Sequence, residues 1–282
     1  MRDVDMTVVA DDGLPLAGTL TLPPGPGPHP AVLLLHGSGR LDRDGGTKRL
    51  RMALGAPMAA ALAGRGIATL RYDRRGVGAT GGDFRATGFD GHRRDAIAAL
   101  RALAALPGIR PDAVAVVGHS EGAIHAMSLG TRPDVAAVVL LAGFARPGAD
   151  ALAWQADMLA RGLPAPLRPL VRAFVLRTAP AAMRGLLAHD PRPDLADIKV
   201  PVLAITGEKD VQVDPGDLDV IRRLVPADVD TQLVPDLTHL LRRDPGPASV
   251  RSYPRQLRQP VDHDLLTQVA TWLTHTLEKE DA

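Results

Sequence analysis

Short apolar runs alternate along most of this chain with longer segments in which apolar residues recur at helical spacing. Residues 31–35 (Ala-Val-Leu-Leu-Leu) and 113–117 (Ala-Val-Ala-Val-Val) are continuously apolar, as expected of strands that are covered on both faces. Between them, Ile97, Leu100 and Leu103 form a helical stripe. Strands that alternate with helices in this way form parallel sheets with crossover helices. The sequence therefore predicts an α/β fold: a mostly parallel central sheet with helices on both faces.

The same patterns predict the remaining elements. An opening pair of strands lies within residues 4–22, and a short helix runs from Pro57 to Gly64. The helix that carries the Ile97 stripe starts near Asp90. Further strands are expected at 67–71, 135–141, 201–206 and 231–234, and a closing helix at 265–277. The proline-rich stretch 242–262 is predicted to be an irregular loop, and a solvated linker is its simplest role.

A long segment separates the strand that ends near Leu141 from the one that begins near Val202. It has about sixty residues, whereas connections in α/β units usually have about 2–6. We therefore expect a helical cap of residues 144–198, inserted into a core domain of residues 1–143 and 199–282.

Apolar residues of the expected cap follow helical spacing. Packing onto the core is the simplest role for any one of them. We nevertheless expect one or two of Trp154, Met158 and Phe174 to line a substrate pocket, together with Tyr253 from the proline-rich stretch.

Composition excludes several classes of function. The 33 basic and 32 acidic side chains nearly cancel, and two Trp, two Tyr and four Phe offer little stacking surface, so a nucleic-acid partner is not expected. The absence of cysteine excludes disulfides, a thiolate nucleophile and Cys-ligated metal centres. Acids near the N-terminus and the lack of an apolar run of about 20 residues argue against a signal peptide or a membrane partner. A cytoplasmic location is the expectation.

One pentapeptide predicts covalent chemistry. Residues 118–122 (Gly-His-Ser-Glu-Gly) follow the buried strand 113–117 and precede a helical pattern. This is the setting of the Gly-x-Ser-x-Gly turn, which exposes a serine hydroxyl at the edge of the sheet. Glycines suit the flanks because the backbones approach closely where the strand reverses into the helix. Ser120 is therefore the candidate nucleophile.

A serine hydroxyl needs a base to remove its proton, and the base needs a carboxylate to orient it. In this architecture the expected chain order is serine, acid, histidine. Asp210 lies just beyond the strand 201–206, and His239 follows the last strand. Of the nine histidines, His239 best fits this order and position, so it is the candidate base. Asp210 is the preferred acid, with Asp236 and Asp214 as alternatives.

The reaction also needs donors for the oxygen that becomes negative. The backbone N–H of Glu121 supplies one candidate. The second should come from the loop after 31–35, where the N–H of Ser38 is the first choice and that of Gly37 the second. His36 precedes the nucleophile, so we expect it to anchor this loop by hydrogen bonding.

Two further motifs have simpler explanations. In Asp42-Arg43-Asp44 the arginine between the acids favours internal pairing over a metal site. Arg74 and Arg75 are expected to form ion pairs within their loop or at the surface.

These motifs resemble the α/β-hydrolase superfamily over about residues 15–280. The segments 36–45 and 70–78 are similar to those of bacterial carboxylesterases related to dienelactone hydrolases and prolyl-oligopeptidase-type hydrolases. The resemblance implies a triad of Ser120, His239 and Asp210, with no metal and no organic cofactor. True dienelactone hydrolases use a cysteine nucleophile, which this chain lacks.

The function expected from these features is hydrolysis of small carboxylic esters, such as those with short acyl chains, through an acyl-enzyme. An acyl-CoA thioesterase or acyltransferase is an alternative, in which the cap arginines contact phosphates. The cap arginines are Arg161, Arg168, Arg172 and Arg177, for which a solvated face is the simplest role. A peptidase and a non-catalytic binding protein on the same scaffold are further alternatives. The natural substrate and the oligomeric state are left open.

Overall fold

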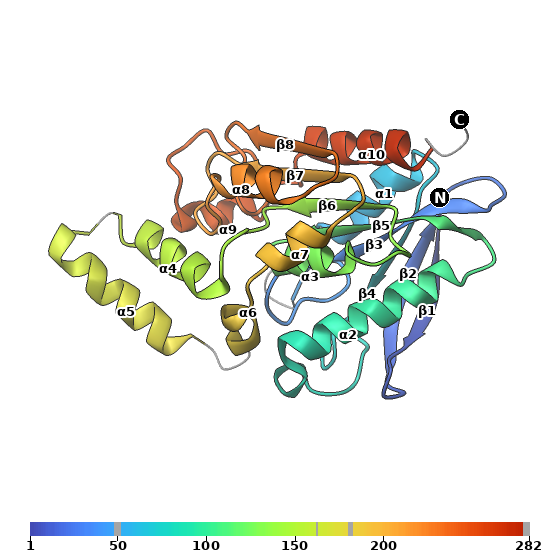
Figure 1. Cartoon of the computed structure of the whole chain (residues 1–282), viewed down its shortest axis with the longest axis horizontal. Helices are drawn as coiled ribbons and strands as arrows, with labels where there is room; N and C mark the ends of the chain where they lie inside the picture. The colour runs from blue at the N-terminus through green and yellow to red at the C-terminus, as the bar shows by residue number, and fades with distance from the viewer. Residues whose placement is uncertain (48–51, 162, 180–182, 279–282) are drawn as a thin grey trace.

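An eight-stranded sheet runs through the centre of the molecule (Figure 1). The computed structural model describes residues 1–47, 52–161, 163–179 and 183–278. The strand order is β1-β2-β4-β3-β5-β6-β7-β8. β2 pairs antiparallel with β1 and β4, and each neighbouring pair from β4 to β8 is parallel. The predicted α/β class is confirmed.

The bounds of the elements are as follows. The strands are β1 Arg2–Val9, β2 Pro15–Leu22, β3 His29–Leu35, β4 Ala68–Tyr72, β5 Ile109–His119, β6 Ala137–Leu141, β7 Val202–Gly207 and β8 Val229–Val234. The α-helices are α1 Gly55–Ala63, α2 Phe84–Ala104, α3 Glu121–Leu129, α4 Gly148–Leu159, α5 Arg168–Thr178, α6 Arg184–Ala188, α7 Arg192–Asp197, α8 Asp217–Leu224, α9 Tyr253–Gln256 and α10 His263–Leu277. The described residues also form the 3-10 turns η1 Ala165–Leu167 and η3 Val250–Ser252.

The sheet has a hydrophobic core on each face. On β5, Val114 and Val116 belong to the core that packs against α2, α3 and α8, whereas Ala115 and Val117 belong to the core that packs against α1 and α10. Successive side chains of a strand point to opposite faces, so a strand buried on both sides must be apolar at every position. This is why residues 113–117 of β5 and 31–35 of β3 are continuous apolar runs, and both strands lie at the centre of the sheet.

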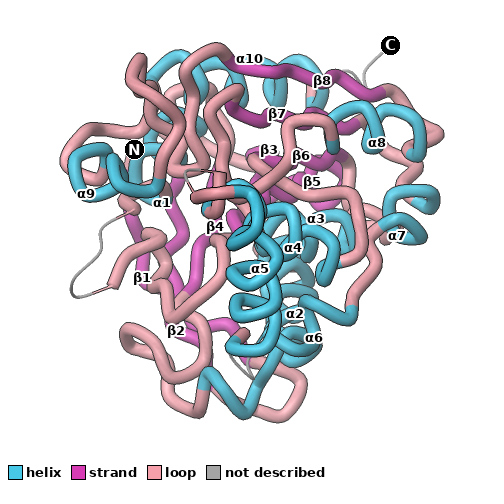
Figure 2. The backbone as a smooth tube through the Cα atoms, turned by 90° about the vertical axis from the view of Figure 1, so that its left-hand side faces the viewer, coloured by secondary structure: helices cyan, strands magenta, loops and turns pink. Residues whose placement is uncertain are grey.

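In the described part of the segment between β6 and β7 there are four α-helices, α4 to α7. α4 and α5 extend away from the sheet at one end of the molecule (Figures 1 and 2), and none of the residues of α5 is buried. Leu195 of α7 and the following Ile198, by contrast, are fully buried in the core beside α3 and α8. We therefore propose a cap narrower than 144–198, ending before α7.

Two elements differ from their sequence predictions. α2 starts at Phe84 rather than near Asp90, because the Asp83 side chain caps it by accepting from the N–H groups of Arg85 and Ala86, and Gly88 then kinks it. The stretch 242–262 is not a solvated linker. It contains η3 and α9, and the buried carboxylate of Asp244 accepts from residues of α9 at 2.7–2.9 Å.

Within the described ranges, none of the helices combines the length and the hydrophobicity that crossing a bilayer requires.

Candidate active site

The strand-to-helix turn at Ser120 is backbone-strained. Ser120 stands between β5 and α3 with φ 56° and ψ −120°, a conformation that residues with a side chain rarely adopt. Its N–H donates to the carbonyl of Leu141 at the end of β6, at 2.9 Å. The turn is thus tied to the neighbouring strand, and it holds the half-buried Ser120 side chain at the carboxyl edge of the sheet.

The glycines on either side of Ser120 have no room for a side chain. A Cβ on Gly118 would lie 2.2 Å from the carbonyl oxygen of Gly122. A Cβ on Gly122 would lie 2.3 Å from the carbonyl oxygen of Leu35 and 2.8 Å from that of His36. These contacts are with backbone, which cannot rotate away, so the turn packs directly against the end of β3 and the loop that follows it.

Gly122→Ala is therefore expected to displace the turn from the loop after β3. We expect a loss of about 2–3 kcal/mol in the free energy of unfolding, the upper part of the range for overpacked sites, together with loss of any activity that depends on the loop. Urea denaturation measures the first effect. Gly108→Ala is the matched control, because its Cβ meets nothing within 4 Å. Equal stability of the two variants would contradict the close packing.

The structure brings three side chains together at this edge. The Nε2 of His239 lies 3.1 Å from the Oγ of Ser120, and its Nδ1 lies 2.8 Å from Oδ2 of Asp210. The carboxylate can only accept, so Nδ1 carries the hydrogen and Nε2 is left to accept from the serine hydroxyl. Asp210 is itself fixed, since its Oδ1 accepts from the N–H groups of Gln212 and Val213 at 2.7 and 2.9 Å.

The two alternative acids are engaged elsewhere. Asp236 pairs with Lys209 at 2.7 Å, and Asp214 pairs with Arg146 at 2.8 Å. Both are partly exposed, whereas the Asp210 side chain is shielded from solvent. The geometry therefore favours Asp210 as the partner of His239.

The loop after β3 reaches the nucleophile. Gly37 is buried so close to Ser120 that a Cβ on it would lie 3.1 Å from the Cβ of Ser120. His36 anchors the loop as expected, because its Nε2–H donates to the carbonyl of Arg43 at 2.7 Å. Burial lowers the pKa of His36 to about 4, so the ring is neutral at neutral pH. Gly37 and Ser38 both line the cavity beside Ser120.

Arg74 connects the two segments that carry the candidate oxyanion donors. Its guanidinium donates to the carboxylate of Glu121 at 3.0 Å and to the carbonyl of His36 at 2.7 Å. Burial alone would raise the pKa of Glu121, but the Arg74 charge and the interactions with His125 together outweigh it and lower that pKa to about 2. A permanent ion pair therefore holds the residue after the nucleophile against the loop after β3.

The other charged motifs form structural ion pairs. Arg75 pairs with Asp95 and Asp12. Arg43 pairs with Asp73 at 2.8 Å and not with the acids beside it in sequence, which corrects the expected internal pairing. Over the described part of the chain, no group of three or more acidic or histidine side chains is arranged to hold a metal ion.

Two residues near His239 were not singled out by the sequence. His119 donates from Nε2 to the carbonyl of His239 at 2.9 Å, and burial lowers its pKa to about 3, so it stays neutral. Arg242 is buried and its guanidinium donates to the carbonyls of Leu240 and Met52. Burial lowers the Arg242 pKa to about 10. Both side chains bind backbone of distant segments, so no local sequence pattern signals them.

A cavity of about 410 Å³ opens beside Ser120 and His239. Tyr253 lines this cavity, so part of the stretch 242–262 lies against the candidate site. Its apolar lining residues are Leu41, Met52, Leu240, Val250, Tyr253, Pro254 and Leu257.

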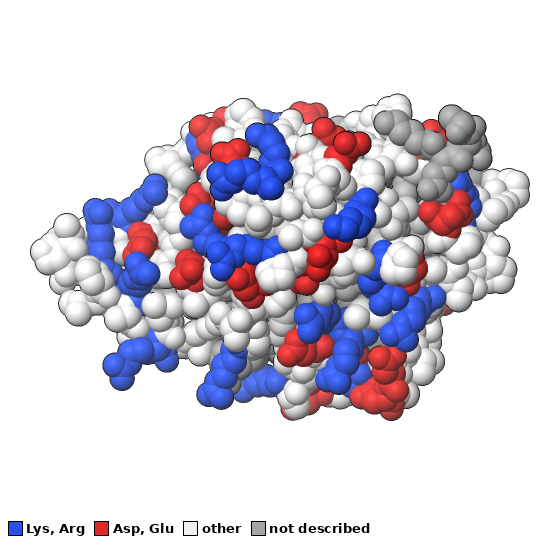
Figure 3. Space-filling model, in the orientation of Figure 1, with Lys and Arg blue, Asp and Glu red and all other residues white. Residues whose placement is uncertain are grey.

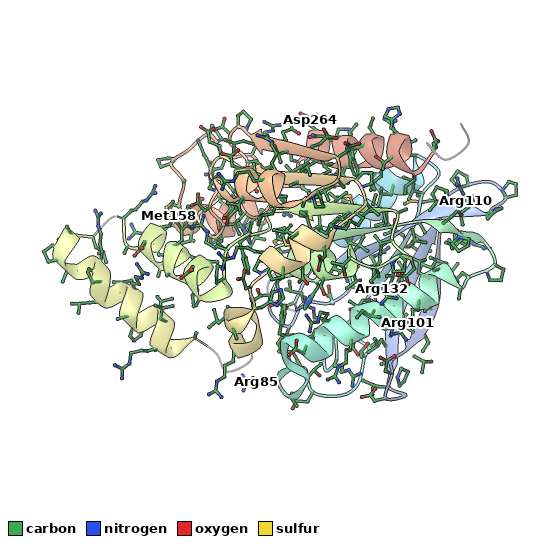
Figure 4. All side chains as sticks on the ribbon, in the orientation of Figure 1. Arg85, Arg101, Arg110, Arg132, Met158 and Asp264 are labelled. Atoms are coloured by element: carbon green, nitrogen blue, oxygen red, sulfur yellow. The ribbon has the colours of Figure 1, made fainter. Side chains whose placement is uncertain are left out.

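The three pocket candidates from the cap do not line this cavity. Phe174 is 66% exposed on α5, a helix that packs along α4 and has no buried residue, so Phe174 does not take the predicted place in the wall of this cavity. Trp154 is half-buried on α4 and lies outside the lining. Met158, also on α4 (Figure 4), lines a second cavity.

Two histidines are buried behind the nucleophile. His92 is 5% exposed, and its ring packs on Phe84 with centroids 4.8 Å apart. His125 stacks on Phe89 at 4.5 Å. Burial lowers the pKa of His92 to about 3 and also lowers that of His125. Both rings are therefore neutral in the folded protein at neutral pH.

Stability is expected to fall on mild acidification. Because the folded pKa of His92 is about 3 and the ordinary value is 6.5, the unfolded chain takes up a proton below pH 6.5 while the folded one does not. The contribution of His92 to the free energy of unfolding is complete above pH 6.5 and is lost, by at most about 1.4 kcal/mol per pH unit, as the pH falls toward 3.

Urea denaturation between pH 7 and 5 measures how steeply the free energy of unfolding changes with pH, and this slope should be smaller for His92→Phe. The exposed His275→Gln should leave the slope unchanged, and equal slopes for all three proteins would contradict the burial argument.

Comparison with known proteins assigns the family. The model of the serine aminopeptidase S33 family matches residues 51–191, which include the Ser120 turn. The chain belongs to this α/β-hydrolase family.

Its curated relatives include the esterase EstD of Thermotoga maritima, 27% identical over 96% of this chain and 67% of EstD. Another is the 2,6-dihydropseudooxynicotine hydrolase of Paenarthrobacter nicotinovorans, 28% identical over 77% of this chain and 54% of that protein. The aligned regions thus span about half to two thirds of the length of these relatives.

Solved structures of this hydrolase superfamily share the fold. The crystal structure of 2,6-dihydroxy-pseudo-oxynicotine hydrolase superposes with a TM-score of 0.66 at 24% identity, over 98% of this chain and 68% of that one. The esterase Est1E of Butyrivibrio proteoclasticus, solved with ferulic acid bound, gives 0.65 at 17% identity over 96% of each chain. The resemblance to the α/β-hydrolase superfamily is confirmed.

Proposed function

We propose that this chain is a serine esterase that cleaves small carboxylic esters through an acyl-enzyme. The observation that carries the proposal is the continuous chain of contacts from Ser120 through His239 to Asp210, at 3.1 and 2.8 Å. The hydrolase family and the likeness to EstD support it.

In the proposed mechanism Ser120 attacks the ester carbonyl while His239 takes the hydroxyl proton. Asp210 holds the Nδ1–H tautomer and stabilises the imidazolium that forms. The N–H groups of Glu121 and of Ser38, with Gly37 as the alternative, stabilise the oxyanion. His239 then protonates the leaving alcohol, and a water activated by the same ring releases the acid.

The cavity favours small, uncharged acyl groups. Its lining is mainly apolar and its volume is about 410 Å³, in the lower part of the usual range for small-molecule sites. A short acyl chain fits within such a space.

A peptidase is the second candidate, because the matching family model carries the name serine aminopeptidase. An aminopeptidase must bind the protonated amine of its substrate, and a carboxylate is the usual partner of a buried ammonium. Of the described residues that line the cavity, none is acidic. This difference favours the esterase.

A substrate panel tests the proposal. We expect 4-nitrophenyl acetate and butanoate to be hydrolysed faster, by kcat/KM, than the decanoate, a butanoyl thioester or an amino-acid 4-nitroanilide. Faster cleavage of the nitroanilide would favour the peptidase, and faster cleavage of the thioester would favour the thioesterase. No turnover of any ester would overturn the proposed function.

A further inference from the structure

A second cavity adjoins the catalytic one. It has a volume of about 390 Å³ and lies between the end of α4 and the segment before α9. Val250 lines both cavities. Val211 lines the second, and its neighbour Gln212 lines the catalytic cavity. The two spaces therefore meet along the segment that follows Asp210.

Hydrogen bonds fix the boundary between the two cavities. Gln212 donates from Nε2 to the Tyr253 hydroxyl at 3.0 Å and accepts from Gln155 of α4 at 3.3 Å. The same Gln212 binds Asp210 through its backbone N–H. The position of α4 is thus connected directly to the catalytic carboxylate and to the wall of the catalytic cavity.

The second cavity is lined mainly by apolar side chains, and the charged side chains among its described lining residues are arginines. Met158, Leu163 and Val211 are among its apolar lining residues. Arg161 and Arg251 also line it, and of the described residues that do so none is acidic. In the described part of the chain neither guanidinium forms an ion pair with a carboxylate, whereas those of Arg74, Arg146 and Arg255 do. Lysine and arginine also predominate at this end of the molecule (Figure 3).

We propose that this second cavity binds an anionic oxygen group, a carboxylate or a phosphate, at the far end of an ester held at Ser120. The inference rests on the proposed function and narrows its substrate class to amphipathic esters with an apolar spacer and an anionic end. The apolar lining suits the spacer. The two guanidinium groups suit the anion, since arginine presents several N–H donors to carboxylate or phosphate oxygens.

Matched pairs of esters test the inference. One series carries the charge on the acyl side, comparing mono(4-nitrophenyl) hexanedioate with 4-nitrophenyl hexanoate. The other carries it on the alcohol side, comparing the butanoyl ester of 6-hydroxyhexanoate with hexyl butanoate. Hydrolysis is followed by pH-stat titration, and the measured quantity is the ratio of kcat/KM for the charged ester to that for the neutral one.

The ratio is expected to exceed one in at least one series. Arg161→Met and Arg251→Met should each lower this ratio about fivefold, mainly by raising KM for the charged ester. A factor of five corresponds to about 1 kcal/mol, the upper end of the range for an exposed ion pair. Arg177→Met removes an exposed cap arginine that lines neither cavity and should leave the ratio unchanged. Raising the salt concentration should lower the ratio for the unsubstituted protein.

The outcomes separate the two proposals. If neutral esters are hydrolysed but no charged ester is preferred, or if Arg177→Met lowers the ratio as much as the other two variants, the second site is overturned and the esterase stands. If no ester is hydrolysed, the proposed function fails. Butanoyl-CoA distinguishes the sources of the anion: an Arg161- and Arg251-dependent KM for butanoyl-CoA indicates phosphate, and dependence only for the carboxylate esters indicates carboxylate.

Discussion

Ser120→Ala is expected to lower kcat for ester hydrolysis by a factor of about 10³ or more. The substitution removes the oxygen that attacks the carbonyl and leaves His239 and Asp210 in place. No cysteine is available to replace it as a nucleophile. Steady-state kinetics on 4-nitrophenyl butanoate measures the effect, and the oxyanion donors alone should leave a small residual rate above that of the uncatalysed reaction.

The control for this variant is its fold. Alanine keeps the Cβ that already occupies the strained position at φ 56°, so thermal unfolding should change little. Labelling by a fluorophosphonate reagent should disappear in Ser120→Ala and remain in Ser38→Ala, the other serine that lines the cavity. A rate within tenfold of that of the unsubstituted protein would remove Ser120 from the mechanism.

The sheet edge explains why the candidate site could be predicted before the fold was seen. Ser120 follows β5, His239 follows β8 and Asp210 follows β7, and all three strands are parallel neighbours or near neighbours. The carboxyl ends of parallel strands share one edge, so residues far apart in sequence are brought together there. The hydrophobic pattern of the sequence predicts where the strands lie. A residue that directly follows such a strand is then expected at the shared carboxyl edge of the sheet.

Long-range packing explains what could not be predicted. Arg74 contacts Glu121 and Arg242 contacts Met52, partners that are separated by many residues and by different loops. His92 lies at a position whose local pattern resembles a solvated helix start, yet it is buried and its ring packs on Phe84. Such contacts depend on how loops meet in space, which periodicity does not encode.

The prolines of 242–262 gave a misleading signal for a related reason. Proline disfavours regular elements but not order. Here Asp244 binds Arg255 and Gln256 at 2.7–2.9 Å within the segment, and the hydroxyl of Thr238, the residue before His239, donates to Gln256 at 2.8 Å, so hydrogen bonds between side chains order the segment and hold it against the site. Two cavities are built on this segment, and the substrate range of the protein is therefore expected to depend on it more than on α5.

Asp210→Asn is expected to lower kcat by a factor of about 10²–10⁴. The amide has no charge to stabilise the imidazolium. It can also turn its NH₂ group toward His239 Nδ1, at the position now 2.8 Å from Oδ2, which would move the ring hydrogen to Nε2. A ring with its hydrogen on Nε2 cannot accept the proton of Ser120, so the geometry would persist while the base is lost.

Asp236→Asn and Asp214→Asn are the matched controls. Each removes the same charge from a neighbouring loop, but Asp236 pairs with Lys209 and Asp214 with Arg146, both at partly exposed positions. Their effect on kcat should stay within about threefold, since exposed ion pairs contribute about 1 kcal/mol or less. If Asp236→Asn were the more damaging variant, the carboxylate that orients His239 would have to be Asp236, and the backbone donors that fix Asp210 would serve only the loop after β7.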